Sequence, residues 1–186
     1  VLIDADDSSF KTGEDVHVLR LGHALDSVGC AALPPLAEQR MRGLNTLTNR
    51  LLDTTELVIL LTGLGGGVGT GAAHEFARQA RQSGAVVLAV AALPFEQQTT
   101  RMDIALEGLN RLESTAHVTV RLSLDRLARQ AREKGQLWQM GAEWIEDLVD
   151  GLVRTLMRMG LINLDLMDLR AIVDQTGEAT MLVGVG

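Results

Sequence analysis

Short apolar stretches alternate along the chain with longer segments in which apolar residues recur every three or four positions. Two of the apolar stretches, at residues 57–61 and 85–91, are continuous, which is typical of strands buried on both faces of a parallel sheet. Shorter stretches also predict strands, and these lie at residues 1–3, 16–21, 117–120 and 180–183.

Segments with helical periodicity separate these strands. Helices are predicted at residues 36–52, 72–83, 101–114, 125–133, 136–159 and 168–174. Pro34 and Pro35 are expected in the loop before the first of them. The repeated order of strand, loop and helix predicts an α/β fold with a mostly parallel sheet flanked by helices. Ligands of such sheets bind at the carboxyl ends of the strands.

Composition excludes several classes of protein. The 186 residues suit one domain, or one domain with part of a second. A net charge of −7 argues against a general binder of nucleic acid or of anionic membranes. Cys30 is the only cysteine, so there is neither an intrachain disulfide nor a metal site made of cysteines alone.

The location of the protein is also predicted from its sequence. No apolar run approaches the ~20 residues that a membrane span needs, and no signal peptide is visible. We therefore expect a cytoplasmic protein. Val1 and Gly186 both lie in or beside apolar runs, so we expect both ends to fall inside a longer fold.

A glycine-rich turn at residues 63–71 follows one predicted strand and precedes a helix. Glycine permits positive φ and a close approach of the backbone to a ligand. The backbone N–H groups of such a turn, together with the start of the following helix, form a site for anions. This context favours phosphate binding over a turn that serves only helix packing.

Two common phosphate motifs fit the turn poorly. A P-loop requires Gly-Lys-Ser/Thr, but Lys11 and Lys134 are the only lysines of the chain. Residues 67–72 match the dinucleotide fingerprint weakly, and the acid expected about 20 residues further on is absent, because Glu96 is the first acid in that direction.

Three segments instead resemble the tubulin/FtsZ superfamily, in the form found in FtsZ. Residues 65–73, Gly-Gly-Gly-Val-Gly-Thr-Gly-Ala-Ala, resemble its phosphate loop. Residues 92–95, Ala-Leu-Pro-Phe, with Arg101-Met102 after them, are similar to its Lys-Pro-Phe…Arg-Met segment. Residues 160–170 are similar to its Gly-Leu-Met-Asn-Val-Asp-Phe-Ala-Asp-Val-Arg. Together the segments cover most of the chain in the right order.

The resemblance implies a protein that binds GTP or GDP with Mg²⁺, assembles head to tail with itself and hydrolyses GTP at subunit interfaces. It implies a GTP-binding domain at residues 1–135 whose first strand and loop are missing, a central helix at 136–160, and a catalytic loop with the start of a C-terminal domain at 161–186. The implied nucleotide-binding residues are Gly65, Gly66, Gly67, Val68, Gly69, Thr70, Gly71, Ala31, Ala32, Arg101, Trp138 and Glu143.

Carboxylates supply the implied catalytic and metal sites. Asn163, Asp165 and Asp168 match the family's catalytic loop, where two acids help a water attack the γ-phosphate. The alternative for the two acids is helix capping. Asp4 and Asp6 match positions near the metal, or they belong to a solvated turn. Trp138 either stacks on guanine or packs in the core, while Glu143 would bind the base.

Some positions depart from the family pattern. Val68 replaces a threonine of the phosphate loop, and Ala31 and Leu33 fall in the segment that senses the γ-phosphate. Leu124 stands where the family has an asparagine that reads the base, and Gln97 stands near the place of a ribose-binding glutamate. Each lost polar contact to a buried ligand group costs roughly 1–3 kcal/mol.

Two functions therefore remain open. The first is a GTPase that polymerises and hydrolyses GTP, which Asn163, Asp165 and Asp168 favour. The second is a divergent relative that hydrolyses GTP weakly or not at all and serves as a filament scaffold, which the departures favour. A nicotinamide-dependent oxidoreductase is disfavoured because the ribose-binding acid is absent.

Overall fold

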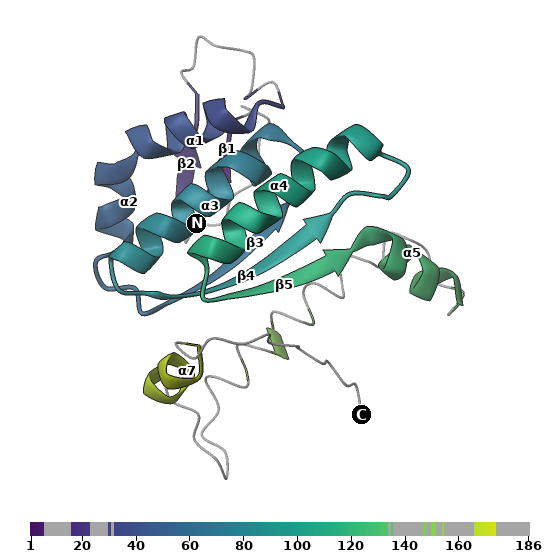
Figure 1. Cartoon of the computed structure of the whole chain (residues 1–186). Coiled ribbons are helices and arrows are strands. Elements are labelled where there is room, and N and C mark those ends of the chain that lie inside the picture. Colours follow the sequence, from purple (N-terminus) through teal and green to yellow (C-terminus); the bar gives the residue numbers. More distant parts are fainter. Residues whose placement is uncertain are drawn as a thin grey trace.

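The computed structural model describes residues 1–5, 16–22, 30, 32–133, 135, 147, 150–151, 154 and 166–173. Strands and helices alternate along these residues (Figure 1). The strands are β1 (Leu2–Asp4), β2 (Val18–Arg20), β3 (Leu57–Gly63), β4 (Val86–Leu93) and β5 (Val118–Ser123). The helices are α1 (Pro34–Gly43), α2 (Asn45–Leu52), α3 (Gly67–Gln82), α4 (Thr99–Thr115), α5 (Leu124–Glu133) and α7 (Leu166–Val173).

The strands form two parallel sheets. Strand β4 lies between β3 and β5, with Leu57 opposite Val86 and Leu88 opposite Val118. Strands β1 and β2 pair separately, with Leu2 opposite Val18. The central strand β4 is buried over its first six residues, which explains its continuous apolar sequence. All strand pairs among the described residues are parallel, so the predicted α/β fold is confirmed.

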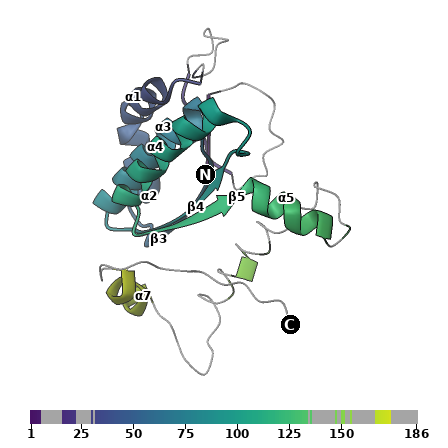
Figure 2. The same ribbon diagram turned by 45° about the vertical axis from the view of Figure 1, so that its right-hand side comes forward.

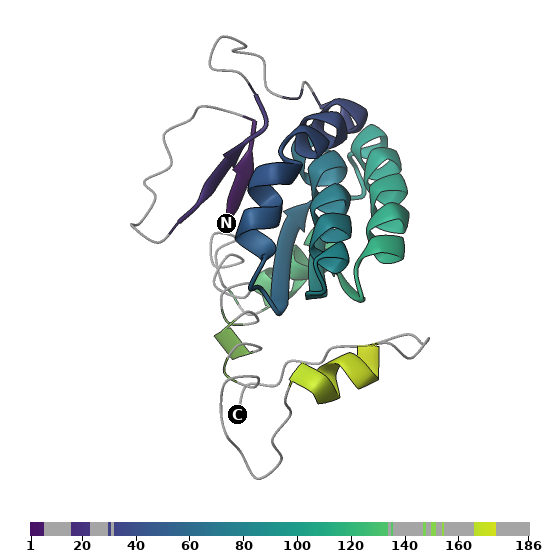
Figure 3. The ribbon, with the colours of Figure 1, turned by 90° about the vertical axis from the view of Figure 1, so that its left-hand side faces the viewer.

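Helices α3 and α4 cover one face of the three-stranded sheet, and α1 packs beside α3 (Figures 1 and 3). The core between these layers includes Met41 of α1, Phe76 and Ala77 of α3, Val87 of β4 and Leu109 of α4. Burying an aliphatic or aromatic side chain of this size contributes roughly 1.5–3 kcal/mol. Helix α5 projects from the end of β5, away from α3 and α4 (Figure 2).

Several predicted boundaries were wrong. The prolines lie in the first turn of α1 rather than in a loop, because proline has its φ already set for a helix and needs no N–H partner there. One helix was predicted over 36–52, but the chain leaves helical geometry at Leu44, after the poor helix former Gly43. Helix α3 begins at Gly67, five residues earlier than predicted.

The other predicted strands and helices within the described residues are present. The strand predicted at 180–183 lies outside the described residues, as does most of the helix predicted at 136–159. Asp147, Asp150, Gly151 and Arg154 are described from that helix, and all four are helical. No helix in the described part of the chain is both long and apolar enough to span a membrane.

Candidate functional site

The glycine turn lies where β3 ends and α3 begins, at the carboxyl end of the sheet. Gly65 has a φ of +94°, and a Cβ on it would come within 2.8 Å of the backbone oxygen of Arg101. Both facts restrict this position to glycine. A Cβ on Gly69 would come within 2.0 Å of the Gly63 oxygen, so glycine also lets α3 begin directly against the end of β3.

The first turn of α3 has no side chain that caps it. Gly66 is the N-cap residue, with extended backbone geometry and no side-chain hydrogen bond to the helix. The first turn also contains no acidic residue. The backbone N–H groups at a helix start carry a partial positive charge and need acceptors. An anion such as a phosphate group would supply those acceptors.

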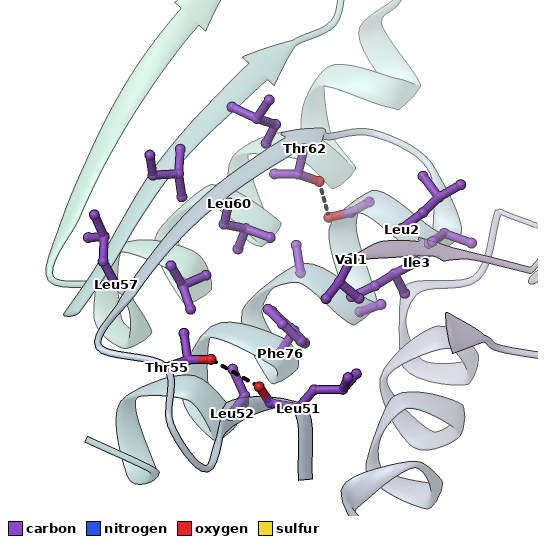
Figure 4. Close-up of a pocket in the computed structure, with 17 residues that line it drawn as sticks. Val1, Leu2, Ile3, Leu51, Leu52, Thr55, Leu57, Leu60, Thr62 and Phe76 are labelled. Carbon is purple, nitrogen blue, oxygen red and sulfur yellow. Dashed lines mark hydrogen bonds between the residues drawn. The ribbon is translucent and has the colours of Figure 1, made fainter. Parts of the chain in front are cut away.

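Two threonine hydroxyls fix the shape of the turn. The hydroxyl oxygen of Thr70, which is only 4% exposed, accepts the N–H of Gly65 at 2.9 Å. The hydroxyl of Thr62 donates to the carbonyl oxygen of Gly69 at 2.8 Å (Figure 4). Thr62 was not among the predicted site residues, although a polar residue directly after an apolar strand was a usable signal. Together these bonds tie the turn to the end of β3 and to the first turn of α3.

The structure brings several predicted residues together around this turn. Gly67 lies against the segment before α1, since a Cβ on it would come within 3.0 Å of the Cys30 oxygen and the Leu33 nitrogen. Ala32 lies in that segment, with a positive φ of 55°. Arg101, at the start of α4, lies against Gly65. Residues from three separate regions of the sequence therefore surround the uncapped helix start.

Other predicted site residues lie elsewhere or outside the described residues. Asp4 ends β1, and its carboxylate accepts the N–H of Ala5 at 2.6 Å. Asp168 is exposed in the first turn of α7. The predicted residues outside the described part of the chain are Asp6, Ala31, Trp138, Glu143, Asn163 and Asp165.

Helix α7 contacts the end of the sheet opposite the glycine turn. The Arg170 guanidinium of α7 donates to the carbonyl oxygen of Gly84, which lies just before β4 begins. The glycine turn instead follows the carboxyl end of β3, a seven-residue strand that spans roughly 20 Å. Asp168 therefore lies on a helix that contacts the far end of the sheet from the turn through this hydrogen bond.

A cluster of charged side chains is buried between α1, α3 and α4. Glu75 of α3 has no exposed side-chain surface. Its carboxylate accepts hydrogen bonds from Arg78 at 2.5 and 2.9 Å, from Gln79 at 3.0 Å and from Arg42 at 3.3 Å. Burial alone would raise the pKa of Glu75, but these hydrogen bonds lower it to about 2.

Glu38 of α1 extends this cluster to α4. Its carboxylate accepts hydrogen bonds from Arg111 at 2.5 Å and from Arg42. Burial opposes ionisation of Glu38, yet these partners still lower its pKa. The Nε2 atom of His74 lies 3.6 Å from Glu38, and its Nδ1 atom lies 3.4 Å from the Thr70 carbonyl oxygen. Burial, followed by the charge of Arg111, lowers the pKa of His74, so the ring is neutral at pH 7.

Glu38, His74 and Glu75 also place ligand atoms within 4.8 Å of one another, close enough to hold a metal ion. However, the two carboxylates already pair with the guanidiniums of Arg42, Arg78 and Arg111, which leaves the cluster with an excess positive charge. A divalent cation would have to displace these partners. The cluster is therefore suited to fixing α3 against α1 and α4 rather than to binding a metal.

A second feature near the turn is an apolar cavity between β1 and β3 (Figure 4). Its volume is about 490 Å³. Side chains of β1 and β3 line two of its sides, and Phe76 of α3 and Leu51 of α2 lie at its base. Val68 and Gly69, from the first turn of α3, also line it. Because its walls are largely apolar, the cavity does not suit a charged phosphate group.

Comparisons with known proteins give a consistent assignment. The family model described as Tubulin/FtsZ family, GTPase domain, matches residues 1–132. The chain is 30% identical over 187 residues to cell division protein FtsZ 2 of Halobacterium salinarum, a match that covers 99% of this chain and 48% of that protein.

Solved structures with the same fold also match the chain. A structure of FtsZ from M. jannaschii superposes with a TM-score of 0.78 and 27% identity, covering 92% of this chain and 53% of that one. An empty FtsZ dimer from M. jannaschii gives a TM-score of 0.66 and 28% identity, covering 76% of this chain and 42% of that one.

A parallel sheet whose glycine turn opens an uncapped helix defines an α/β domain of the nucleotide-binding class. Because the family model covers more than half of the sequence, the chain belongs to the tubulin/FtsZ family. It spans about half the length of the relatives that it matches.

Proposed function

We propose that this chain carries the nucleotide-binding domain of an FtsZ-like GTPase that assembles head to tail with copies of itself. GTP or GDP binds at the glycine turn, and GTP is hydrolysed where two subunits meet. Residues 1–135 form the GTP-binding domain, 136–160 the central helix, and 161–186 the catalytic loop with the start of a C-terminal domain. The empty dimer of a relative supports self-association.

The single observation that carries nucleotide binding is the uncapped start of α3 behind Gly65. A Cβ on Gly65 or Gly67 would have backbone atoms within about 3 Å, so glycine lets Arg101 and the segment before α1 pack closely against this helix start. The N–H groups of residues 66–69 would hold the phosphate oxygens there. Bound Mg²⁺ would neutralise part of the phosphate charge, with Asp4 and Asp6 as the candidates for its protein ligands.

The remaining roles follow from the family pattern. Trp138 stacks on guanine, and Glu143 accepts the N–H donors of the base. Asn163, Asp165 and Asp168 orient the attacking water. The position of Asp168 supports hydrolysis between subunits, because its helix contacts Gly84, at the end of the sheet opposite the glycine turn. An acid so placed serves the site of a neighbouring subunit better than its own.

A specific observation favours the second candidate, a filament scaffold with weak hydrolysis. Leu33 is 55% exposed beside Gly67, at the mouth of the proposed phosphate site. An isobutyl group there cannot donate a hydrogen bond to the γ-phosphate. The two candidates share nucleotide binding and assembly, and they differ in the rate of turnover.

Equilibrium binding of GTP and of ATP, measured by calorimetry on the intact protein, tests the proposal. We expect GTP to bind more tightly than ATP. In the variant Gly67→Val, the added side chain would meet the backbone of Cys30 and Leu33 and push the start of α3 out of place, so binding should be lost. Gly43→Ala is the control, because a Cβ there has nothing within 4 Å. Failure of the unmodified protein to bind any guanine nucleotide would refute the proposal.

A further inference from the structure

Thr70 connects the glycine turn to helix α4. At one end of its side chain, the hydroxyl oxygen accepts the N–H of Gly65 at 2.9 Å. At the other end, its methyl group faces Gly108 of α4: a Cβ built on Gly108 would come within 2.2 Å of the Thr70 Cγ2 atom. One side chain thus contacts the turn with its polar atom and α4 with its apolar atom.

The contact at Gly108 leaves no room for a side chain. Cβ atoms in proteins essentially never approach another heavy atom more closely than 3.0 Å. Helix α4 cannot easily move away, because Ala105, Leu109 and Leu112 on either side of Gly108 are buried in the core. A methyl group at position 108 would therefore displace the Thr70 side chain.

Displacement of Thr70 would release Gly65. The N–H of Gly65 is buried with Thr70 as its acceptor, and a buried donor without a partner is costly. Gly65 is also confined from the other side, because its Cα lies against the backbone of Arg101 at the start of α4. Arg101 and Gly108 are two helical turns apart, so one face of α4 holds the turn at two points.

We infer that Thr70 and Gly108 are positioning residues for the phosphate site. Gly108 contacts Thr70 and is not itself part of the phosphate site. Through Thr70, however, it determines the position of the Gly65 backbone and of the uncapped start of α3. This inference rests on the proposed nucleotide binding at that turn. Backbone N–H groups bind phosphate oxygens only within a few tenths of an ångström of 2.9 Å, so a small shift of the turn weakens several contacts together.

Affinity for GTP in matched variants is the first test. Gly108→Ala is expected to weaken GTP binding about tenfold or more. Gly43→Ala, the same substitution in open space on α1, should leave it unchanged. Thr70→Val keeps the packed methyl group but removes the acceptor for the Gly65 N–H, and it should also weaken binding about tenfold.

The double variant Gly108→Ala with Thr70→Ser provides the rescue. Serine lacks the Cγ2 atom and keeps the hydroxyl, so the nearest Thr70 atom to the new Cβ becomes the side-chain Cβ at 3.4 Å, an ordinary contact. We expect this double variant to recover most of the affinity that Gly108→Ala loses.

Hydrogen exchange at the Gly65 amide, measured without nucleotide, separates this inference from the proposed function. The amide should be protected in the unmodified protein, exposed in Gly108→Ala and Thr70→Val, and protected again in the double variant. If neither the variants nor the unmodified protein binds guanine nucleotide but exchange follows this order, the proposed function fails, while the role of Thr70 and Gly108 in placing the Gly65 backbone stands. Unchanged exchange and unchanged affinity in Gly108→Ala, or no recovery in the double variant, would overturn the inference.

Discussion

Ala32 adopts a backbone conformation that disfavours its own side chain. Its φ of 55° falls in the left-handed region, where a Cβ costs about 1–2 kcal/mol. The residue is exposed and lies in the segment against Gly67, at the mouth of the candidate site. Strain of this kind is retained where the surrounding structure requires it.

Replacing Ala32 with glycine should therefore stabilise the protein. The free energy gained by relieving the left-handed strain exceeds the cost of ordering the more flexible glycine on folding. We therefore expect the free energy of unfolding to rise by about 1 kcal/mol. Urea denaturation, monitored by circular dichroism, measures this free energy. The control is Ala128→Gly in the interior of α5, which should lower stability by about 1 kcal/mol. A loss of stability in both variants would contradict the assigned φ.

For individual residues, the sequence predicted the glycine turn but not the contacts that shape it. A strand followed by closely spaced glycines and a helix is a local pattern, and it was sufficient to locate residues 63–71. The positive φ of Ala32 could not be predicted, because alanine avoids that region without tertiary constraints. The proximity of Arg101 to Gly65 depends on how α4 packs, which no local pattern specifies.

At the level of helices and strands, the buried ionic cluster around Glu75 determines how α3 packs against α1 and α4. Removing one carboxylate from such a cluster leaves its cationic partners without compensation. Glu75→Gln should therefore lower the free energy of unfolding at pH 7 by about 2–3 kcal/mol, since the arginine partners are partly exposed and can reach water. The control Glu113→Gln breaks an exposed pair with Arg121 and should cost no more than about 1 kcal/mol.

The same cluster predicts how stability depends on pH. The pKa of Glu75 falls from 4.5 to about 2 on folding, so its contribution is complete above pH 4.5 and is lost as the pH falls towards 2. The loss should be about 3 kcal/mol. The pKa of His74 is also lowered, so the unfolded state takes up that proton first and stability already declines below pH 6.5. In denaturation experiments from pH 7 to 2, the free energy of unfolding of Glu75→Gln should fall less below pH 4.5 than that of the unmodified protein.

The order of elements was predictable from hydrophobic periodicity, whereas some boundaries were not. Helix α3 starts among glycines, which are poor helix formers, because their lack of side chains allows contact with Gly63 and Pro34. The prediction therefore placed the helix start too late. The pair of Glu38 and Arg42 on α1 was not predicted, although a spacing of four residues within a helix was a usable signal. The meeting of α1, α3 and α4 around Glu75 depends on tertiary packing, which no local pattern specifies.

For the whole molecule, the position of Asp168 predicts that one subunit completes the site of another. Asp168→Ala should bind GTP normally but abolish turnover, while Gly67→Val should bind none. Mixing the two inactive variants should restore part of the GTP turnover, because a subunit with an intact turn can meet one with an intact Asp168. Phosphate release measured across mixing ratios, with each variant alone as control, is the readout. Mixtures no more active than their components would argue against a shared site.

Turnover should also depend on protein concentration. A site completed by two subunits is assembled by a bimolecular event, so GTP turnover per subunit should rise steeply with concentration before reaching a plateau. Steady-state assays over a hundredfold range of concentration test this expectation. A rate per subunit that stays constant over that range would indicate a site complete within one subunit.

The cavity between β1 and β3 affects how the domain behaves in solution. Within the described residues, β1 pairs only with β2, and β3 pairs only with β4, so each of the two strands leaves one edge unpaired, and residues of both line the cavity. Unsatisfied strand edges recruit other chains and promote aggregation. A further strand seated in the cavity would join the two sheets into one and protect both edges. Solubility of the domain should therefore depend on whether that space is filled.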